Sequence, residues 1–304
     1  MTVLGIDIGG TRIKAGLVDE NGAVVERRSV DTPLTLDAFR ESLVRLVGEF
    51  RRERPAAAGI GCKGIVEFES TRVLALPGDM HYLEGHRLSE LAGLDVPARA
   101  DNDARVAMAG EMMWGAARGL RNALLLTLGT GVGGAVLAEG ALVRGAGGVA
   151  GHLGHMTIEP EGPVCCCGNR GCLETIFSAR AIEADAFRAG LGREITCEAV
   201  FRRAGEGDIL AREIRDRAVG ALAAGLAGLL HIFDPEAVIL TGQIAEAGED
   251  LFGPLAREVE RRTRCLLRRQ VPLVGPGCED RSGVAGAAAL VSGHLFGATS
   301  FSTG

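Results

Sequence analysis

The feature that most constrains this chain is a pattern of short elements that occurs twice. In the first copy, the apolar run 3–8 precedes a glycine turn at 9–11, a second apolar run and an Asn-Gly turn. In the second copy, the apolar run 123–128 precedes a glycine-rich turn at 129–134, another apolar run and a Glu-Gly turn. Short apolar runs between such turns are typical of β-hairpins. Because the copies are about one domain length apart, rather than about 20–50 residues as in solenoids, the sequence predicts two related lobes.

Helical segments separate the predicted strands. Between the two copies lie a helical pattern at 36–52 and a strand pattern at 57–61. After the second copy come helical patterns at 179–189 and 208–232 and a buried strand at 237–240. Strands that alternate with helices predict an α/β protein. The predicted organisation is a smaller N-terminal lobe (residues 1–117, with the C-terminal helix 283–296 packed back on it), a larger lobe (118–282) and a disordered tail (297–304).

Composition limits the kind of partner that this chain can have. The 304 residues are 47% hydrophobic and 24% charged, which is enough apolar sequence for two lobes with cores of their own. The formal net charge of -6 argues against nucleic acid, because phosphate backbones require clustered Lys and Arg. We expect no membrane-spanning segment, which would need about 20 consecutive apolar residues, and no signal peptide. The sequence therefore predicts a cytoplasmic protein with a small-molecule substrate and no membrane partner.

The first glycine turn predicts a site for a nucleotide. Asp7 ends a buried strand pattern beside Gly9 and Gly10, which let backbone N–H groups approach an anion closely. This arrangement suits a nucleotide phosphate with its Mg²⁺. A plain hairpin turn capped by Asp7 is the alternative that this segment leaves open.

The second turn formally matches the dinucleotide fingerprint G-x-G-x-x-G at residues 129–134. That fingerprint has to open a helix and be followed by an acidic residue about 20 positions later. Here a short strand and a Glu-Gly turn follow instead, so a phosphate loop of the kinase type is favoured over the NAD site of a dehydrogenase. The P-loop pattern G-x-x-x-x-G-K-[ST] does not occur.

Asp101-Asn102-Asp103 contains the best candidate for a catalytic base. Phosphoryl transfer to a hydroxyl needs a carboxylate that can take the hydroxyl proton. The triplet lies between a strand pattern at 96–100 and a helix pattern at 104–114, and open α/β sheets bind ligands at such strand ends. Asp101 or Asp103 also suits a helix cap. Capping and catalysis can therefore belong to different members of the triplet.

Four cysteines between positions 165 and 172 form the most specific local signal. In a reducing compartment such a cluster points to metal rather than to disulfides, with a buried unliganded group as the alternative. Three thiolates and one imidazole complete a closed tetrahedral shell, which is typical of structural zinc. Cys166 is treated as a non-ligand, because adjacent cysteines would chelate one ion awkwardly. The predicted zinc ligands are His155, Cys165, Cys167 and Cys172.

Five motifs, taken in order, resemble a known family. They are D-I-G-G-T-R-I-K from Asp7, D-N-D-A-R-V-A from Asp101, L-G-T-G-V-G-G from Leu128, G-V-A-G-H-L-G-H from Gly148 and C-C-C-G-N-R-G-C-L-E from Cys165. Together they look like the ROK family of sugar kinases and repressors, over essentially the whole chain. The resemblance implies a two-lobe, ribonuclease-H-like fold of the actin/hexokinase type with an interlobe cleft. It also implies ATP-dependent phosphorylation of a hexose hydroxyl, which in a glucokinase gives the sugar 6-phosphate.

The resemblance further implies roles for individual residues. Asp103 would be the general base, and His155 would use one ring nitrogen for zinc and the other for the sugar. ATP, Mg²⁺ and structural Zn²⁺ would be bound, and the family suggests a homodimer or homotetramer. The implied sugar contacts are Gly64, Asn102, Asp103, His152, His155 and Glu174. The implied nucleotide contacts are Asp7, Gly9, Gly10, Thr11, Lys14, Thr130, Gly131 and Gly242.

Three departures from the family pattern bear on the ligands. His152 stands where glucokinases of the family usually have Glu, and it resembles some bacterial N-acetylmannosamine kinases. A kinase of N-acetylmannosamine or another N-acetylhexosamine is therefore the alternative to a glucokinase, unless His152 only fills space. Ala75 replaces the usual Asn before Leu76-Pro77-Gly78-Asp79, a loop that flanks the sugar pocket in the family. The double glycine expected near adenine is present only as Thr241-Gly242-Gln243.

A sugar-responsive repressor, or a non-catalytic sugar-binding regulator, is the competing class within the family. Repressors of the family have a helix-turn-helix domain before the first glycine motif, which begins at Asp7 here. Together with the acidic composition, this early start favours the enzyme.

Overall fold

A computed structural model describes residues 1–76, 78–280 and 283–295. The chain divides into two compact units. Unit 1 contains Met1–Leu120, Gly140–Ala150 and the described residues from Pro276 onward, and unit 2 contains Arg121–Glu139 and Gly151–Gly275. The predicted tail 297–304 and Pro77 lie outside the described residues, and the predicted lobe limits remain a proposal.

The sheet of unit 1 has the strand order β3-β2-β1-β4-β7. Strands β1, β2 and β3 pair antiparallel, whereas β4 and β7 continue the sheet in the direction of β1. The five strands are β1 (Val3–Ile8), β2 (Arg12–Val18), β3 (Val24–Asp31), β4 (Ala58–Cys62) and β7 (Ala98–Asn102). A small second sheet joins β5 (Ile65–Val66) to β6 (Val73–Ala75), followed by the short helix η2 (His81–Leu83).

The sheet of unit 2 repeats the order of pairing seen in unit 1. Strand β8 (Ala123–Leu128) pairs antiparallel with β9 (Val132–Ala138) and parallel with β11 (Ala237–Thr241). Strand β12 (Leu273–Val274) continues the sheet beyond β11. The short β10 (Ala141–Leu142) belongs to the chain segment assigned to unit 1. The predicted duplication is thus confirmed, except that Gly133 and Gly134 form part of β9 rather than of the glycine turn.

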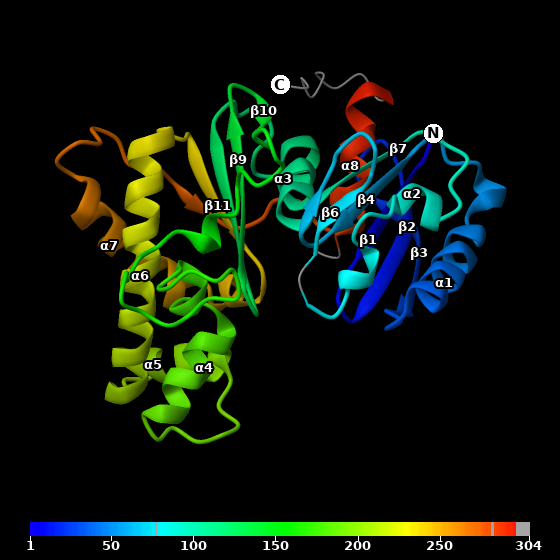
Figure 1. Ribbon diagram of the computed structural model, residues 1–304. Coiled ribbons are helices and arrows are strands. Elements are labelled where there is room, and N and C mark those ends of the chain that lie inside the picture. The colour runs from blue at the N-terminus through cyan, green and yellow to red at the C-terminus, as the bar shows by residue number, and fades with distance from the viewer. Residues whose placement is uncertain (77, 281–282, 296–304) are drawn as a thin grey trace. The chain divides into compact units, whose positions relative to one another are not determined.

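Opposite faces of the first sheet pack against different helices (Figure 1). Leu4 and Ile6 of β1 belong to the core cluster that includes Phe39 and Leu43 of α1 (Leu36–Gly48). Alternate residues of the same strand face the other side, where α8 (Val284–Leu295) packs across β1 and β4. This alternation is what the two-residue period of a strand dictates. The C-terminal helix α8 therefore packs on the sheet of unit 1.

Two strand glycines allow this close approach of α8. A Cβ atom on Gly5 would lie 2.0 Å from the carbonyl oxygen of Val284, and one on Gly59 would lie 1.7 Å from that of Ala287. No side chain fits at either position without moving the helix. The remaining helices of unit 1 are η1 (Arg51–Glu53), α2 (Leu88–Leu91) and α3 (Asp103–Trp114). The single helix predicted at 36–52 is therefore α1 followed by a separate short turn.

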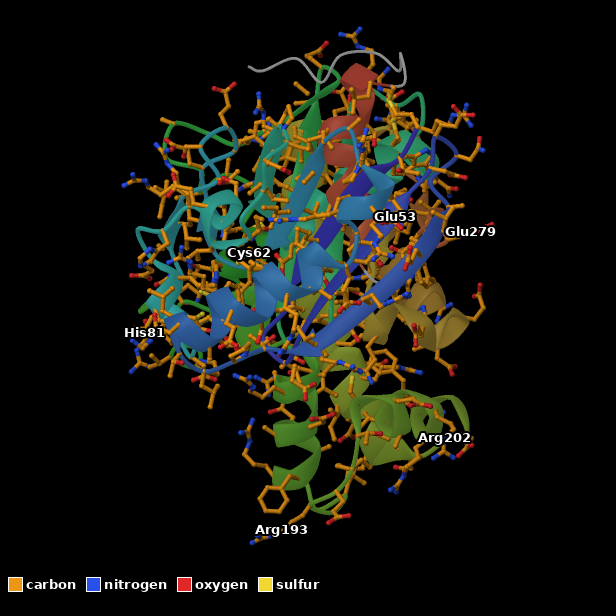
Figure 2. The ribbon with its side chains drawn as sticks, turned by 90° about the vertical axis from the view of Figure 1, so that its right-hand side faces the viewer. Glu53, Cys62, His81, Arg193, Arg202 and Glu279 are labelled. Carbon is orange, nitrogen blue, oxygen red and sulfur yellow. The ribbon has the colours of Figure 1, made fainter. Side chains whose placement is uncertain are left out.

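Helices form about half of unit 2. Its helices are η3 (Leu153–His155), η4 (Leu173–Thr175), α4 (Ala179–Arg188), α5 (Cys197–Gly205), α6 (Ile209–Phe233), η5 (Gln243–Ala247) and α7 (Glu249–Thr263). Helices α5 and α7 are absent from the sequence prediction. Arg193, between α4 and α5, and Arg202 on α5 project into solvent from this end of unit 2 (Figure 2). Thr196 caps α5 by accepting a hydrogen bond from the backbone N–H of Ala199.

Helix α6 reaches membrane-spanning length, which the sequence prediction did not foresee. It has 25 residues, and its most apolar window has a mean hydropathy of 1.3. By length and composition alone it could cross a membrane, but 56% of that window is buried inside the protein. Because α6 packs along α5 and α7, its apolar residues are those expected of a central core helix.

Candidate functional site

Three parallel strands of unit 1 end at one edge of the sheet. In the register of β1, β4 and β7, Ile8 is paired with Cys62, and Cys62 with Asn102. Asp7 lies one position before the end of β1, and Asp103 follows directly after β7 as the first residue of α3. The triplet thus spans the end of β7 and the start of α3, because β7 ends two residues beyond the predicted limit, and it lies at the same edge as the first glycine turn.

Asp7 is largely buried and has charged neighbours. Lys14, its partner across the β1–β2 hairpin, places Nζ 3.6 Å from Asp7 Oδ2. Burial raises the pKa of Asp7 to about 6, and the negative charge of Asp103 adds to the rise while Lys14 opposes it. Two carboxylates thus act on one another at this strand edge, which is an arrangement suited to a cation or a shared proton.

The backbone of the first glycine turn is fixed by hydrogen bonds. Gly9 donates its N–H to the carbonyl oxygen of Arg12 at 3.1 Å, and its own carbonyl oxygen accepts from Thr32 Oγ1 at 2.7 Å. A Cβ atom on Gly9 would lie 2.9 Å from the Arg12 oxygen, so this position needs glycine. Gly10 and Thr11 follow as exposed turn residues. The turn therefore offers an ordered backbone next to Asp7.

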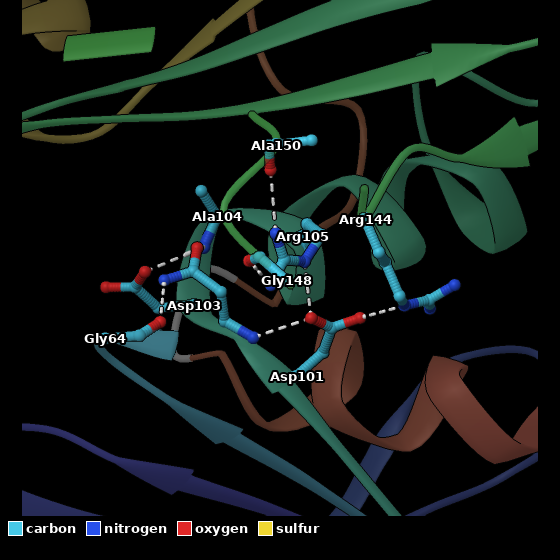
Figure 3. A network of polar contacts seen from close by, with 9 residues as sticks. Gly64, Asp101, Asp103, Ala104, Arg105, Arg144, Gly148 and Ala150 are labelled. Carbon is cyan, nitrogen blue, oxygen red and sulfur yellow. Dashed lines mark hydrogen bonds and ion pairs between the residues drawn. The ribbon is translucent and has the colours of Figure 1, made fainter. Parts of the chain in front are cut away.

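The members of the Asp101-Asn102-Asp103 triplet have different tasks (Figure 3). Asn102 is the helix cap, because its side chain accepts from the backbone N–H of Ala104 at 3.0 Å. Its amide nitrogen donates to the carbonyl oxygen of Gly64 at 2.9 Å. Asp103 Oδ1 accepts from the same N–H at 2.9 Å, whereas Asp101 does not cap the helix. Asp103 is exposed, so its carboxylate can reach a ligand.

Asp101 is the centre of a buried ionic network that the sequence did not reveal (Figure 3). Arg105 Nε and Arg144 Nε donate to its two carboxylate oxygens, the second at 2.8 Å. Arg105 also donates to the carbonyl oxygens of Gly148 at 3.2 Å and Ala150 at 2.8 Å. The network therefore ties the start of α3 to the 144–150 loop. The i,i+4 spacing of Asp101 and Arg105 was the only sequence signal for it.

Gly64 has a conformation that other residues rarely adopt. Its φ is +86°, and a Cβ atom would lie 2.4 Å from the carbonyl oxygen of Ala75. The Gly64 carbonyl in turn holds the side chain of Asn102. The two predicted sugar contacts Gly64 and Asn102 thus form one local structure beside Asp103.

In unit 2, the second glycine turn is bound to Glu174. The carboxylate of Glu174 accepts from the backbone N–H of Val132 at 2.9 Å, and a Cβ atom on Gly131 would lie 2.3 Å from the same oxygen. Glu174, predicted as a sugar contact, therefore lies beside the predicted phosphate contacts Thr130 and Gly131. Gly242 has a φ of +92°, and a Cβ atom there would lie 2.5 Å from the carbonyl oxygen of Leu128 at the end of β8.

The predicted zinc ligands converge within unit 2. His155 Nδ1 lies 3.5 Å from Cys165 Sγ, and Cys167 Sγ lies 3.6 Å from Cys172 Sγ. All four ligand atoms lie within 4.8 Å of one another. Bonds of about 2.3 Å to sulfur place the ligands of a tetrahedral zinc about 3.8 Å apart. The His155–Cys165 and Cys167–Cys172 pairs are close to this separation, and the wider pairs would have to approach by up to about 1 Å around one ion.

Two further residues flank this cluster. Cys166 Sγ lies 3.8 Å from Glu174 Oε1 and 4.0 Å from Cys165 Sγ, so Cys165, Cys166 and Glu174 form a second group of potential ligands. The ring of His152 lies parallel to that of His155, with centroids 6.3 Å apart and an interplanar angle of 15°. Because Nδ1 of His155 faces the thiol cluster, Nε2 is the nitrogen left for another contact.

The predicted site residues thus form two groups, one in each unit. Unit 1 holds Asp7, Gly9, Gly10, Thr11, Lys14, Gly64, Asn102 and Asp103. Unit 2 holds Thr130, Gly131, His152, His155, Glu174, Gly242 and the cysteines of the predicted zinc site.

Known proteins resemble this chain over most or all of its length. A glucokinase of Thermotoga maritima is 35% identical over 318 residues, which cover 98% of this chain and 99% of that protein. An N-acetylmannosamine kinase of Salmonella typhi is 39% identical over 254 residues, which cover 81% of this chain and 84% of that protein. Both relatives are sugar kinases by name.

Among solved structures, a ROK family glucokinase from Streptomyces griseus in complex with glucose and AMPPNP is 30% identical to this chain. It superposes with a TM-score of 0.80 over 95% of this chain and 99% of its own. The predicted fold of the actin/hexokinase type and the predicted class of enzyme, an ATP-dependent sugar kinase, are thereby confirmed. Residues 3–294 match the sequence pattern of the ROK family, and the chain belongs to this family.

Proposed function

We propose that this protein transfers the γ-phosphoryl group of ATP to a hydroxyl of a hexose, with glucose as the first candidate and the sugar 6-phosphate as the product. The observation that carries the proposal is the meeting of Asp7, the Gly9-Gly10 turn and Asp103 at one strand edge of unit 1. A cation-binding carboxylate, an anion-binding turn and a base are the parts that phosphoryl transfer requires.

Each of these parts has a proposed task. The backbone of Gly9, Gly10 and Thr11 binds phosphate oxygens, with Lys14 beside Asp7. Asp7 holds Mg²⁺, which supplies neutralisation of phosphate charge when it is bound. Asp103 takes the proton of the attacking hydroxyl, because its carboxylate is exposed at the N-terminus of α3.

Sugar and nucleotide are also proposed to contact residues beyond the reacting groups. In unit 1, Asn102 and Gly64, joined by a hydrogen bond of 2.9 Å, are proposed sugar contacts. His155 Nε2 and Glu174 are proposed sugar contacts of unit 2. In unit 2, Thr130 and Gly131 contact phosphates and Gly242 contacts adenine. Since Glu174 also accepts from the N–H of Val132, one carboxylate links the proposed sugar contact to the second glycine turn.

A second candidate function is the phosphorylation of N-acetylmannosamine or another N-acetylhexosamine. His152 favours it, because an imidazole can donate or accept a hydrogen bond whereas the usual Glu carboxylate only accepts. The parallel stacking of His152 on His155 places it next to the proposed sugar contact within unit 2. The N-acetylmannosamine kinase among the relatives supports the same alternative.

An ADP-release assay with Mg-ATP tests both functions. The acceptors are glucose, mannose, fructose, allose, N-acetylglucosamine and N-acetylmannosamine. Fastest turnover on glucose supports the first proposal, and a preference for N-acetylmannosamine that is lost in His152→Glu supports the second. Absence of turnover on all six, with sugar binding retained in calorimetry, would favour a non-catalytic regulator.

We propose structural zinc on His155, Cys165, Cys167 and Cys172, because their ligand atoms are close to the spacing of one tetrahedral shell. The ion would hold the loop that contains His155 and Glu174 in one conformation and so orient the proposed sugar contacts. A closed shell of four protein ligands leaves no position for a reacting water.

Replacing Cys167 with serine is expected to remove zinc and to destabilise this loop, because three remaining ligands hold the ion much more weakly. The matched control is Cys166→Ser, which changes the adjacent thiol and should keep one zinc per chain. Zinc is measured by mass spectrometry of the metal after dialysis, and sugar affinity by calorimetry. Full zinc content in Cys167→Ser, or its loss in Cys166→Ser, would require a different ligand set.

Binding of Mg²⁺ with nucleotide is expected to weaken below pH 6. Asp7 has a pKa raised to about 6, so the carboxylate becomes protonated as the pH falls through this value and loses its affinity for a cation. The effect on stability has the opposite sign. A raised pKa means that the folded state binds the proton more tightly than the unfolded chain, so the contribution of Asp7 to stability improves from about pH 6 towards pH 4.

Titration of AMPPNP with and without Mg²⁺ between pH 5 and 7.5 tests this expectation. The pH effect should be confined to the Mg²⁺-dependent part of the affinity, which separates Asp7 from the histidines of unit 2. An Mg²⁺-dependent affinity that stays constant over this range would remove Asp7 from the metal site.

We further propose that the enzyme works in the cytoplasm as a homodimer or homotetramer and does not bind nucleic acid or membranes. The acidic net charge of -6 supports the absence of nucleic acid. Light scattering of the purified protein tests the oligomeric state.

A further inference from the structure

The two lysines of this chain occur in one place. Of the 33 basic residues only Lys14 and Lys63 are lysines, and all others are arginines. Lys14 lies in β2 with its ammonium 3.6 Å from Asp7, and Lys63 follows directly after β4. Both therefore belong to the strand edge of unit 1 that carries Asp7 and Asp103. In a chain that otherwise uses arginine throughout, this coincidence indicates a need for compact ammonium groups at this edge.

The ammonium of Lys63 lies over the first glycine turn. Its Nζ is 3.5 Å from the position that a Cβ atom on Gly10 would occupy. The preceding residue, Cys62, is the last residue of β4 and lies inside unit 1 (Figure 2), so the sheet fixes the backbone from which Lys63 extends. A side chain at position 10 would meet the ammonium. Because 3.5 Å is an ordinary van der Waals separation, the ammonium lies directly beside the backbone of Gly10.

Lys63 has no partner of its own among the described residues. Within residues 1–76, 78–280 and 283–295 it takes part in no ion pair and no side-chain hydrogen bond, although it is partly buried. Burial raises the pKa of the neighbouring Cys62 thiol to about 12, the negative charges of Asp103 and Asp7 add to the rise, and the ammonium of Lys63 opposes it. The ammonium therefore lies close to Cys62 at this strand edge and has its three N–H donors available for an anion.

A solvated lysine that merely offsets the two carboxylates is the simpler reading of these contacts. It does not explain why the ammonium is placed over the glycine turn rather than on Asp103. It also does not explain why this position is one of only two lysines, since arginine would offset charge equally well. A compact point charge differs from the planar guanidinium mainly where space beside a ligand is limited.

We propose that Lys63 is a catalytic residue that donates hydrogen bonds to the γ-phosphoryl oxygens of ATP during transfer. The proposal rests on the proposed kinase function and adds a residue to it. In the reaction, the bond between the sugar oxygen and the γ-phosphorus forms, the bond to the bridging oxygen of ADP breaks, and the hydroxyl proton passes to Asp103. Lys63 stays protonated throughout and stabilises the negative charge on the transferred group.

Lys63→Met is expected to lower kcat by about 10²- to 10³-fold, as for loss of one donor to transition-state charge, with little change in the KM for the sugar. Lys63→Arg should keep part of the activity. The matched control is Arg45→Met, which removes one exposed cation from α1 and should be neutral. A kcat of Lys63→Met within threefold of the unchanged protein would overturn the proposal.

Nucleotide affinity provides a test that does not depend on turnover. Lys63→Met should weaken binding of Mg-AMPPNP by about tenfold or more, the effect of one charge-assisted hydrogen bond, but leave the affinity for Mg-ADP unchanged. Equal losses for the two nucleotides would mean a general charge effect and would overturn a γ-phosphoryl contact. ADP is the matched control ligand for AMPPNP, because it lacks the γ-phosphoryl group that Lys63 is proposed to contact.

Amine labelling covers the case in which the variants fold poorly. Reductive methylation modifies amines, and this chain has only two lysines and one N-terminus as targets. Mass spectrometry then measures the extent of methylation of Lys63 in the protein without substitutions. Mg-AMPPNP should protect Lys63, whereas Mg-ADP or sugar alone should not. If AMPPNP protects Lys63 from methylation but no sugar is turned over, the proposed kinase function is rejected and the contact of Lys63 with phosphate is kept. If a sugar is turned over but AMPPNP does not protect Lys63, only the contact of Lys63 with the γ-phosphoryl group is rejected.

Discussion

Replacing Asp103 with asparagine is expected to lower kcat by about 10²- to 10⁴-fold, the usual contribution of general-base catalysis. The amide has nearly the same shape as the carboxylate and can still accept the hydrogen bond that Ala104 N–H donates to Asp103 Oδ1 at 2.9 Å. The helix start and the neighbouring Asn102 should therefore keep their geometry. What the substitution removes is the ability to take the hydroxyl proton.

Turnover of Asp103→Asn is measured by ADP release, and its affinities for AMPPNP and sugar by calorimetry. Both affinities should change little, because binding does not require proton transfer. Asp37→Asn is the control, since it makes the same change at an exposed position in the first turn of α1. Turnover within a few-fold of the unchanged protein would exclude Asp103 as the base.

Replacing Asp101 with alanine is expected to destabilise the protein by about 3–5 kcal/mol, because it leaves buried guanidinium groups without their counter-ion. Asp101 is 0% and Arg105 1% exposed. Arg144 stacks on Phe68 with its guanidinium carbon 3.9 Å from the ring centroid, so it cannot move far to find another partner. The loss should also loosen the 144–150 loop, whose carbonyl groups Arg105 holds.

Denaturant unfolding of Asp101→Ala measures this effect. The control is Asp31→Ala, which breaks the pair of Asp31 with Arg12 on the surface and should be nearly neutral because exposed ion pairs contribute little. If the two variants lose similar stability, the buried network does not hold the start of α3 as described. Asp101→Asn should fall between them, since it keeps the shape and one acceptor but removes the charge.

Much of the fold could be predicted because its signals are local. The strand-turn-strand units repeat in the sequence, and β8 (Ala123–Leu128) and α6 (Ile209–Phe233) lie within a residue or two of the predicted limits. Helices α5 and α7 were missed for different reasons. Pro254 and Gly253 interrupt the helical pattern of α7, although Pro254 lies inside the helix. The apolar face of α5 is short, and its Thr196 cap was the main signal.

The candidate site was predictable where its residues are close in sequence. The proposed zinc site needs only the 155–172 segment to fold on itself, and His155, Cys165, Cys167 and Cys172 lie together in the structure. The triplet at Asp101 was placed correctly at a strand end, but the division of its tasks was not. The Ala104 N–H donates to both Asn102 and Asp103, so these two share the helix start, whereas Asp101 turned inward to two arginines.

The sequence by itself determined the strand-turn-strand units, the two glycine turns and the grouping of His155 with the three cysteines, because each depends on residues within one short segment. Only the tertiary structure decided that Arg144 neutralises Asp101, that Lys63 lies over Gly10, and that α8 packs directly on Gly5 and Gly59. These contacts join segments far apart in the chain. A residue's identity does not specify a distant partner, because the sheet register and the packing of the whole unit set which side chains meet.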